Sequence, residues 1–196
     1  MIKNYNKIYI YFSMEDIKDR LSEYKYNFFT NLQNYLGSEL IFYGSIKRYD
    51  YFKESSDIDI TVITDNIKST LLKLQVYLKV QKGKIKKLIQ KFTHQDSNIV
   101  NGYKIKYKDI ENDIIFDILV YDEKYRIPVM NNINKINNLP TYMIVLMCIL
   151  KYLYYTLGLL TKGMFLDIKN FIFTWYFTNK LNFDKKNYMS TIFLDE

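Results

Sequence analysis

The sequence predicts an α+β fold, in which a small mixed β-sheet with flanking helices precedes a short helical domain. Two observations support this fold class. Short β-branched or aromatic runs alternate with helix-period runs up to about residue 138, and only helical patterns follow. An Asn-rich segment separates the two regions. We therefore expect two domains, residues 1–138 and residues 139–196.

The first predicted element is an amphipathic helix. Apolar residues recur at steps of three and four from Met14 to Tyr35. Ser13 with Asp16 three residues later resembles a capping box, and Gly37 suits a C-terminal stop. The pattern indicates one continuous helix that ends before Gly37.

Two strands and two helices are expected next. Residues 39–43 and 57–64 are short β-branched or aromatic runs. Asp65 can cap a helix that carries apolar residues from 67 to 78 on one face, and a second short helix is predicted at residues 84–92.

The centre of the chain predicts a hairpin and a buried strand. Asn101-Gly102 is typical of a tight turn, and residues 103–108 alternate apolar side chains with lysines. Residues 113–121 form a nearly continuous apolar run interrupted by Asp117, which indicates a buried strand with one charge. Residues 131–140 are predicted to form a connector, and the helical half is expected to begin near Pro140.

Composition favours a globular intracellular protein. The chain has 196 residues, 48% hydrophobic and 25% charged, and its net charge of +7 favours polyanionic partners. The single cysteine, Cys148, excludes an intrachain disulfide and fits a reducing compartment. Residues 143–160 have the length of a membrane span, but Lys151 lies near the middle, which favours a buried helix. We expect a cytoplasmic protein without a membrane partner. The excess of residues that have AT-rich codons indicates an AT-rich genome, such as that of a protist or of a virus that infects one.

Two aspartates beside a Gly-Ser pair are the strongest functional signal. Asp57 and Asp59 flank Ile58, and eleven residues separate Asp57 from the Gly44-Ser45 pair. On an extended strand the two carboxylates would share one face, about 7 Å apart, and would repel each other unless a divalent cation lay between them. A solvated strand start is the alternative. Gly44-Ser45, which suits phosphate oxygens, and the third carboxylate of Asp117 favour the metal site.

These motifs resemble the DNA polymerase β-like nucleotidyltransferase superfamily over residues 38–121. Tyr43-Gly44-Ser45, the gap and Asp57-Ile58-Asp59-Ile60 match its signature, and FDIL around Asp117 resembles its third-carboxylate strand. The resemblance implies that Gly44 and Ser45 hold a nucleoside triphosphate. It also implies that Asp57, Asp59 and Asp117 are catalytic and bind two Mg²⁺ (or Mn²⁺) ions.

The helical half is similar to noncanonical poly(A) and terminal uridylyl polymerases, oligoadenylate synthetase and cyclic GMP-AMP synthase. The similarity covers residues 149–173. It implies that Lys151 contacts the triphosphate, whereas Tyr155 stands where a second basic residue often follows. Lys47 and Arg48, just after the Gly-Ser turn, are also expected to contact phosphates.

The expected activity is transfer of a nucleoside monophosphate from an NTP to a hydroxyl, with an RNA 3′ end as the acceptor. Transfer to a second nucleotide, a protein, tRNA or a small molecule is the alternative, as is a catalytically retired subunit that binds nucleic acid. Because the helical half is short, a protein partner or a second copy of the chain is expected to complete the acceptor site.

Three further features of the sequence can be explained without a specific function. The lysines at 84, 87 and 91 would share a helix face, and those at 104, 106 and 108 a strand face. Both faces fit either solvation or a nucleic-acid phosphate track. His94 is expected to be a surface or structural residue, and Trp175 a core residue.

Overall fold

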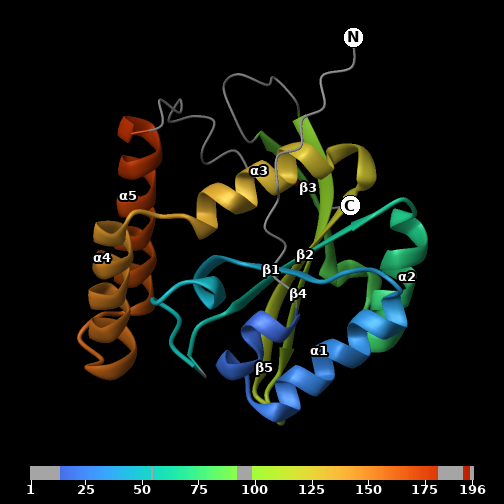
Figure 1. The fold of residues 1–196 in the computed structure, drawn as a ribbon, viewed down its shortest axis with the longest axis horizontal. Coiled ribbons are helices and arrows are strands. Elements are labelled where there is room, and N and C mark those ends of the chain that lie inside the picture. Colours follow the sequence, from blue (N-terminus) through green and yellow to red (C-terminus); the bar gives the residue numbers. More distant parts are fainter. Residues whose placement is uncertain (1–13, 54, 92–98, 181–191, 195–196) are drawn as a thin grey trace.

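The computed structural model describes residues 14–53, 55–91, 99–180 and 192–194 (Figure 1). Its strands form one mixed sheet in the order β1-β2-β5-β4-β3-β6, which confirms the predicted fold class. The strands are β1 (Ile41–Tyr43), β2 (Ile58–Thr64), β3 (Ile85–Lys91), β4 (Ile99–Asp109), β5 (Ile114–Asp122) and β6 (Ile192–Leu194). The central strands β2 and β5 are parallel, and every other neighbouring pair is antiparallel.

One face of the sheet is covered by α1 (Glu23–Leu36) and α2 (Ile67–Leu78), which lie together in Figure 1. Alternate residues of the central strands, such as Ile60 and Phe116, point to this face and are fully buried against helix residues such as Phe29. This cluster is the largest apolar core of the described chain, and it fixes which residues of β2 and β5 point the other way.

The opposite face is covered at one end by α3 (Arg126–Asn137). Its apolar residues, Met130 among them, pack against Ile63 of β2 and Tyr121 of β5. Asp59 and Asp117 lie four residues before Ile63 and Tyr121, so they point to the same face, further along the strands. The face that α3 covers at one end therefore carries the carboxylates at the other.

A helical pair follows α3. It consists of α4 (Thr141–Lys151), a π-helical turn η5 (Tyr152–Thr156) and α5 (Lys162–Lys180), with small apolar clusters of its own around Met143 and Met147. After α5 the chain returns to the sheet, where β6 pairs with β3. The predicted helical half is confirmed, and a domain boundary at residue 138 stays a prediction.

The predicted single N-terminal helix is wrong. A 3₁₀ segment, η1 (Met14–Arg20), precedes α1, which begins at Glu23. Ser22 caps α1, because its Oγ accepts a hydrogen bond from the Lys25 amide at 3.3 Å. Gly37 ends the helix with a φ of 67°, as expected, and Ser13 lies outside the described residues.

The helix predicted at residues 84–92 is also wrong, because residues 85–91 form strand β3, and Lys84 ends a 3₁₀ turn, η3 (Lys82–Lys84), that precedes it. Short apolar runs fit both periods, and the pairing of Ile85 with Ile105 on β4 decides the outcome. Lys84 and Lys87 consequently do not share a face. His94 lies outside the described residues.

The turn predicted at Asn101-Gly102 is wrong as well, since both residues lie inside β4. Gly102 is needed there for close packing, because a Cβ at this position would lie 2.6 Å from the Tyr121 ring. The hairpin connection between β3 and β4 includes residues outside the described part of the chain.

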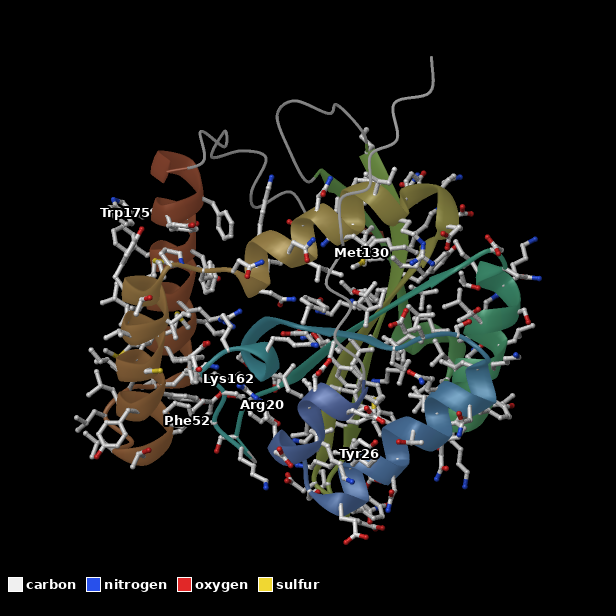
Figure 2. All side chains as sticks on the ribbon, in the orientation of Figure 1. Arg20, Tyr26, Phe52, Met130, Lys162 and Trp175 are labelled. Carbon is white, nitrogen blue, oxygen red and sulfur yellow. The ribbon has the colours of Figure 1, made fainter. Side chains whose placement is uncertain are left out.

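Three further expectations are corrected. The Asn-rich connector at residues 131–140 is mostly helix α3, whose buried apolar side chains outweigh its polar composition. Asn66, not Asp65, caps α2, with its Oδ1 accepting from the Ser69 amide at 3.0 Å. Trp175 lies on the outer side of α5 and is 45% exposed (Figure 2), because only one side of this helix packs against α4.

Within the described residues, no single helix is both long and apolar enough to cross a membrane. One helix pair, Glu123–Asn137 with Thr141–Thr156, meets the length and composition criteria together but is bent by 71°.

Candidate active site

Asp59 and Asp117 form the centre of the candidate site. The parallel register of β2 and β5 pairs them directly, so two half-buried carboxylates lie side by side on one face of the sheet. Asp57 is exposed and immediately precedes the first residue of β2. The structure thus brings two of the three predicted carboxylates together on paired strands, with the third beside them.

Burial and neighbouring carboxylates raise the pKa of the Asp59 carboxyl. Burial contributes most and brings the pKa to about 6, and the charges of Asp117 and Asp57 act in the same direction. Lys169 and Lys104 oppose the increase. Like charges are therefore concentrated where hydration is poor, a condition that a bound cation would relieve.

Lysines of β4 partly balance this negative charge. The Lys104 ammonium group contacts Asp117 Oδ2, and Lys106 Nζ lies 3.8 Å from the same oxygen. In this conformation, no three acidic, histidine or cysteine side chains of the described residues converge as a metal site. The donor set still fits a hard divalent cation, because paired carboxylates are its preferred protein ligands.

Gly44 makes room for the Asp59 carboxylate. It follows β1 with a φ of 77°, and a Cβ there would lie 2.8 Å from Asp59 Oδ2. Only glycine combines this backbone conformation with so close an approach. The Gly44 amide donates to Asn137 Oδ1 at 2.9 Å, so it holds α3 in this structure. The triphosphate contacts predicted for Gly44 and Ser45 stay predictions.

A buried charge network anchors the segment before Asp57. Asp50 is fully buried, and Arg48 donates to its two carboxylate oxygens at 2.8 and 3.0 Å. Lys151 of α4 donates to the Asp50 carbonyl at 2.7 Å and to Ser56 Oγ at 3.2 Å. Arg48 also donates to the Ile136 carbonyl at 2.9 Å. The network joins the segment between β1 and β2 to both α3 and α4.

The structure places the predicted basic residues in surroundings that differ from those expected from the sequence. Lys151 is only 5% exposed, and burial lowers the pKa of its ammonium group to about 8. Lys47 lies elsewhere, near Asp16 and Arg20, and burial lowers its pKa to about 8 as well. The structure thus separates Lys47 from the pair Arg48 and Lys151. Phosphate contacts by all three stay predictions.

Sequence reasoning missed Lys169. This half-buried residue of α5 acts electrostatically on both Asp59 and Lys151, because it lowers the pKa of each. The available signal was a lone lysine in the otherwise largely apolar segment FLDIKNFIF. Asp50 was missed too, and nothing in its sequence context distinguishes it from a loop residue.

An aromatic group lies next to Asp57. Tyr155 of the π-helical turn has its ring centroid 5.9 Å from that of Phe52 and 5.9 Å from that of Phe165. Burial raises the pKa of Tyr155 to about 12, and Asp57 adds to the increase. Figure 2 shows Phe52 in the loop that approaches the helical pair. Single π-helical turns often occur at functional sites.

Comparison with known families matches this geometry. A family model described as a nucleotidyltransferase domain matches residues 26–128, which is more than half of the 196-residue chain. The chain belongs to the nucleotidyltransferase domain family. The match includes both carboxylate strands and the Gly44 turn, and it confirms the resemblance to the polymerase β-like superfamily. Neither the curated proteins nor the solved structures compared with this nucleotidyltransferase gave a match.

Proposed function

We propose that this nucleotidyltransferase adds nucleoside monophosphates to the 3′ hydroxyl of RNA in a metal-dependent reaction. The observation that carries the proposal is the direct pairing of Asp59 with Asp117 beneath the Gly44 turn. The raised pKa of Asp59 supports it, since burial and the neighbouring carboxylates disfavour the negative charge of Asp59, which a bound cation would stabilise.

Asp57, Asp59 and Asp117 would hold the divalent ions. When bound, Mg²⁺ or Mn²⁺ neutralises the developing phosphate charge and makes the attacking hydroxyl more acidic. Asp117 orients the acceptor hydroxyl, while Gly44 keeps space for the Asp59 carboxylate. The hydroxyl oxygen forms a bond to the α-phosphorus and its proton passes to a carboxylate of the cluster and then to water. The α–β bridging bond breaks, and pyrophosphate leaves with the electron pair.

The basic residues around the carboxylates would bind the triphosphate. Lys169 supplies positive charge next to Asp59, on the side of the helical pair. Lys151, through Ser56, fixes the chain that leads into Asp57. The rings of Phe52 and Tyr155, inclined to each other by 40°, lie beside Asp57, where either face can stack on a nucleobase.

RNA is favoured as the acceptor by charge. The chain carries +7, and lysines of β4 lie directly beside Asp117. The alternative acceptors, namely a second nucleotide, a protein, tRNA or a small molecule, use the same carboxylates. A partner or second copy would then complete the acceptor site.

A transfer assay with labelled NTPs, Mg²⁺ or Mn²⁺ and a panel of acceptors tests the proposal. We expect a ladder of extended RNA from the wild type, none from Asp117→Ala, and wild-type behaviour from the exposed control Asp65→Ala. Label fixed on protein, or an oligonucleotide made from NTP alone, would assign another acceptor. RNA binding without any pyrophosphate release would indicate a retired subunit.

A further inference from the structure

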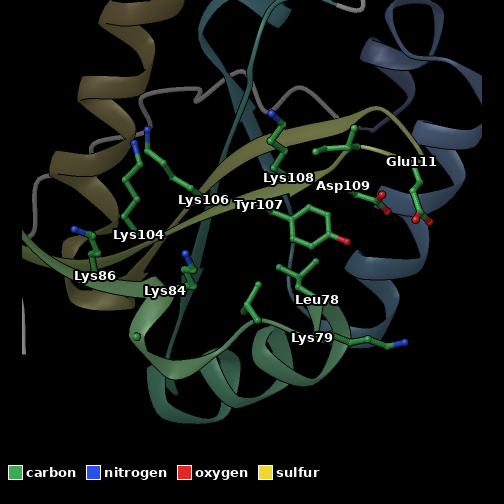
Figure 3. Close-up of a pocket in the computed structure, with 13 residues that line it drawn as sticks. Leu78, Lys79, Lys84, Lys86, Lys104, Lys106, Tyr107, Lys108, Asp109 and Glu111 are labelled. Carbon is green, nitrogen blue, oxygen red and sulfur yellow. The ribbon is translucent and has the colours of Figure 1, made fainter.

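A row of lysines lies beside the carboxylate pair. Figure 3 shows their ammonium groups on one side of β3 and β4, with Leu78 and the Tyr107 ring on the other side. The residues are Lys84, Lys86, Lys104, Lys106 and Lys108, which we call the lysine face. They line a depression of about 1010 Å³ together with residues at the end of α2.

Strand register connects the lysine face to the candidate site. Lys86 pairs with Lys104 across β3 and β4, and Lys106 pairs with Asp117 across β4 and β5. Successive lysines of β4 are about 7 Å apart along the strand. The positive charges therefore extend from the edge of the depression up to the Asp117 carboxylate.

Two lysines of the lysine face share one carboxylate. Lys104 and Lys106 both approach one carboxylate, that of Asp117. Asp109 and Glu111 also line the depression, and Figure 3 shows them beyond Lys108, away from Lys84. Like charges on directly paired strand positions are destabilising, so an extended polyanion would relieve the repulsion.

Sheet order separates this surface from the predicted triphosphate site. Gly44 follows β1 and lies against Asp59, on one side of the β2–β5 pair. The lysine face lies on β4 and β3, on the other side. An NTP held near Gly44 and a chain held on the lysine face would reach the carboxylates from opposite directions, as two reacting substrates must.

We infer that the lysine face binds the phosphate backbone of single-stranded RNA and directs its 3′ end to Asp117. The identification of this RNA as the acceptor rests on the proposed function. Lysines contact phosphates regardless of base, so the binding is independent of sequence and weakens as salt increases.

Fluorescence anisotropy with labelled oligouridine and oligoadenine, in EDTA and without NTP, tests the binding surface. Lys84→Glu/Lys108→Glu should weaken binding of both RNAs by about tenfold or more and reduce the salt dependence, by about 0.7 in logarithmic slope per lost contact. The matched control is Lys18→Glu/Lys68→Glu, which makes the same charge change at exposed positions of η1 and α2.

Equal losses in the two double variants would overturn the inference, because net charge alone would then explain binding. The inference would also be overturned if polyglutamate displaced the labelled RNA as effectively as unlabelled RNA of equal charge does. Folding of each variant is checked by thermal unfolding. Single variants Lys84→Gln and Lys108→Gln replace a double variant that does not fold, with a smaller expected loss of RNA affinity.

Photo-crosslinking tests the direction of the RNA. A 3′-terminal 4-thiouridine should crosslink to β2 or β5, and an internal one to residues 82–86 or 104–108. The reverse pattern would overturn the inference. Both measurements need no catalysis. Failure of nucleotide transfer with intact RNA binding would therefore reject the proposed function alone, whereas transfer to another acceptor without RNA binding would reject this inference alone.

Discussion

Lys104 on β4 contacts the carboxylate of Asp117 on β5, so the residue expected to bind metal is paired with a lysine. The side chains of Lys104 and Asp117 are 21% and 19% exposed, which limits the strength of the pair. A metal ion at Asp117 would have to displace this lysine, and the lysine would then be available to a phosphate.

Lys104→Met should tighten Mn²⁺ binding in the absence of NTP. Loss of a partly exposed ion pair, worth about 1 kcal/mol, corresponds to roughly a fivefold change in affinity. Titration calorimetry measures it, with Lys108→Met as the control on the same strand face. Identical Mn²⁺ affinities of the two variants would show that the ion pair does not compete with metal.

Asp59→Asn should remove part of the pH dependence of stability. The folded-state pKa of about 6 exceeds the ordinary value of 3.8, so the folded chain binds the proton more tightly than the unfolded chain. This contribution is complete below about pH 4 and is lost as the pH increases through 6. We expect Asp59→Asn to be more stable than wild type at pH 7, by roughly 3 kcal/mol, with little difference near pH 4.

Urea unfolding in EDTA at several pH values measures this effect. Asp65→Asn, an exposed carboxylate at the start of α2, serves as the control and should follow the wild-type profile. A constant difference between Asp59→Asn and wild type across the pH range would contradict the explanation. Nucleotide transfer should be lost in Asp59→Asn even where its stability increases, since activity requires the charge.

Gly44→Ala should reduce both stability and activity. A positive φ costs an L-residue about 1–2 kcal/mol, and the new Cβ would also displace the Asp59 carboxylate, 2.8 Å away. Gly37→Ala is a matched control, because Gly37 has a φ of 67° and a Cβ there would have no atom within 4 Å. Equal destabilisation and equal activity in the two variants would show that the contact with Asp59 is unimportant.

Lys151→Met should destabilise the fold by about 1–3 kcal/mol, because the Asp50 carbonyl and Ser56 Oγ lose their donor inside the protein. Activity should decrease as well, since Ser56 precedes Asp57. Denaturant unfolding and steady-state kinetics test this, with the exposed Lys162→Met as the control. Unchanged stability with only a raised KM for NTP would instead assign Lys151 to direct triphosphate binding.

Local sequence patterns correctly predicted the elements in which the period of the apolar side chains and the residues at the termini indicate the same structure. The helix end at Gly37 and the strands around Asp59 and Asp117 are of this kind. Patterns failed where a short apolar run fits two periods, as in β3, which becomes a strand only because β4 pairs with it. They also failed at Asn101-Gly102, where packing against Tyr121 outweighs turn preference.

The candidate site was predictable where the spacing of residues along the sequence indicates their chemistry. Gly44 and the aspartates are found from the interval between motifs, although their direct pairing depends on the parallel register of β2 and β5. The buried Asp50 and the approach of Lys169 were not predictable. They depend on how the helical pair packs against the sheet, which no local pattern specifies.

The parallel pairing of β2 with β5 also has a consequence for folding kinetics. Asp59 and Asp117 are far apart in sequence, and the chain between them, which includes α2, β3 and β4, forms a long loop that closes when β2 pairs with β5. Closing such a long loop is slow, and here the closing step brings two negative charges together. We therefore expect the carboxylate pair to form late in folding, and we expect divalent ions or the Lys104 ammonium group to accelerate that step by screening the repulsion.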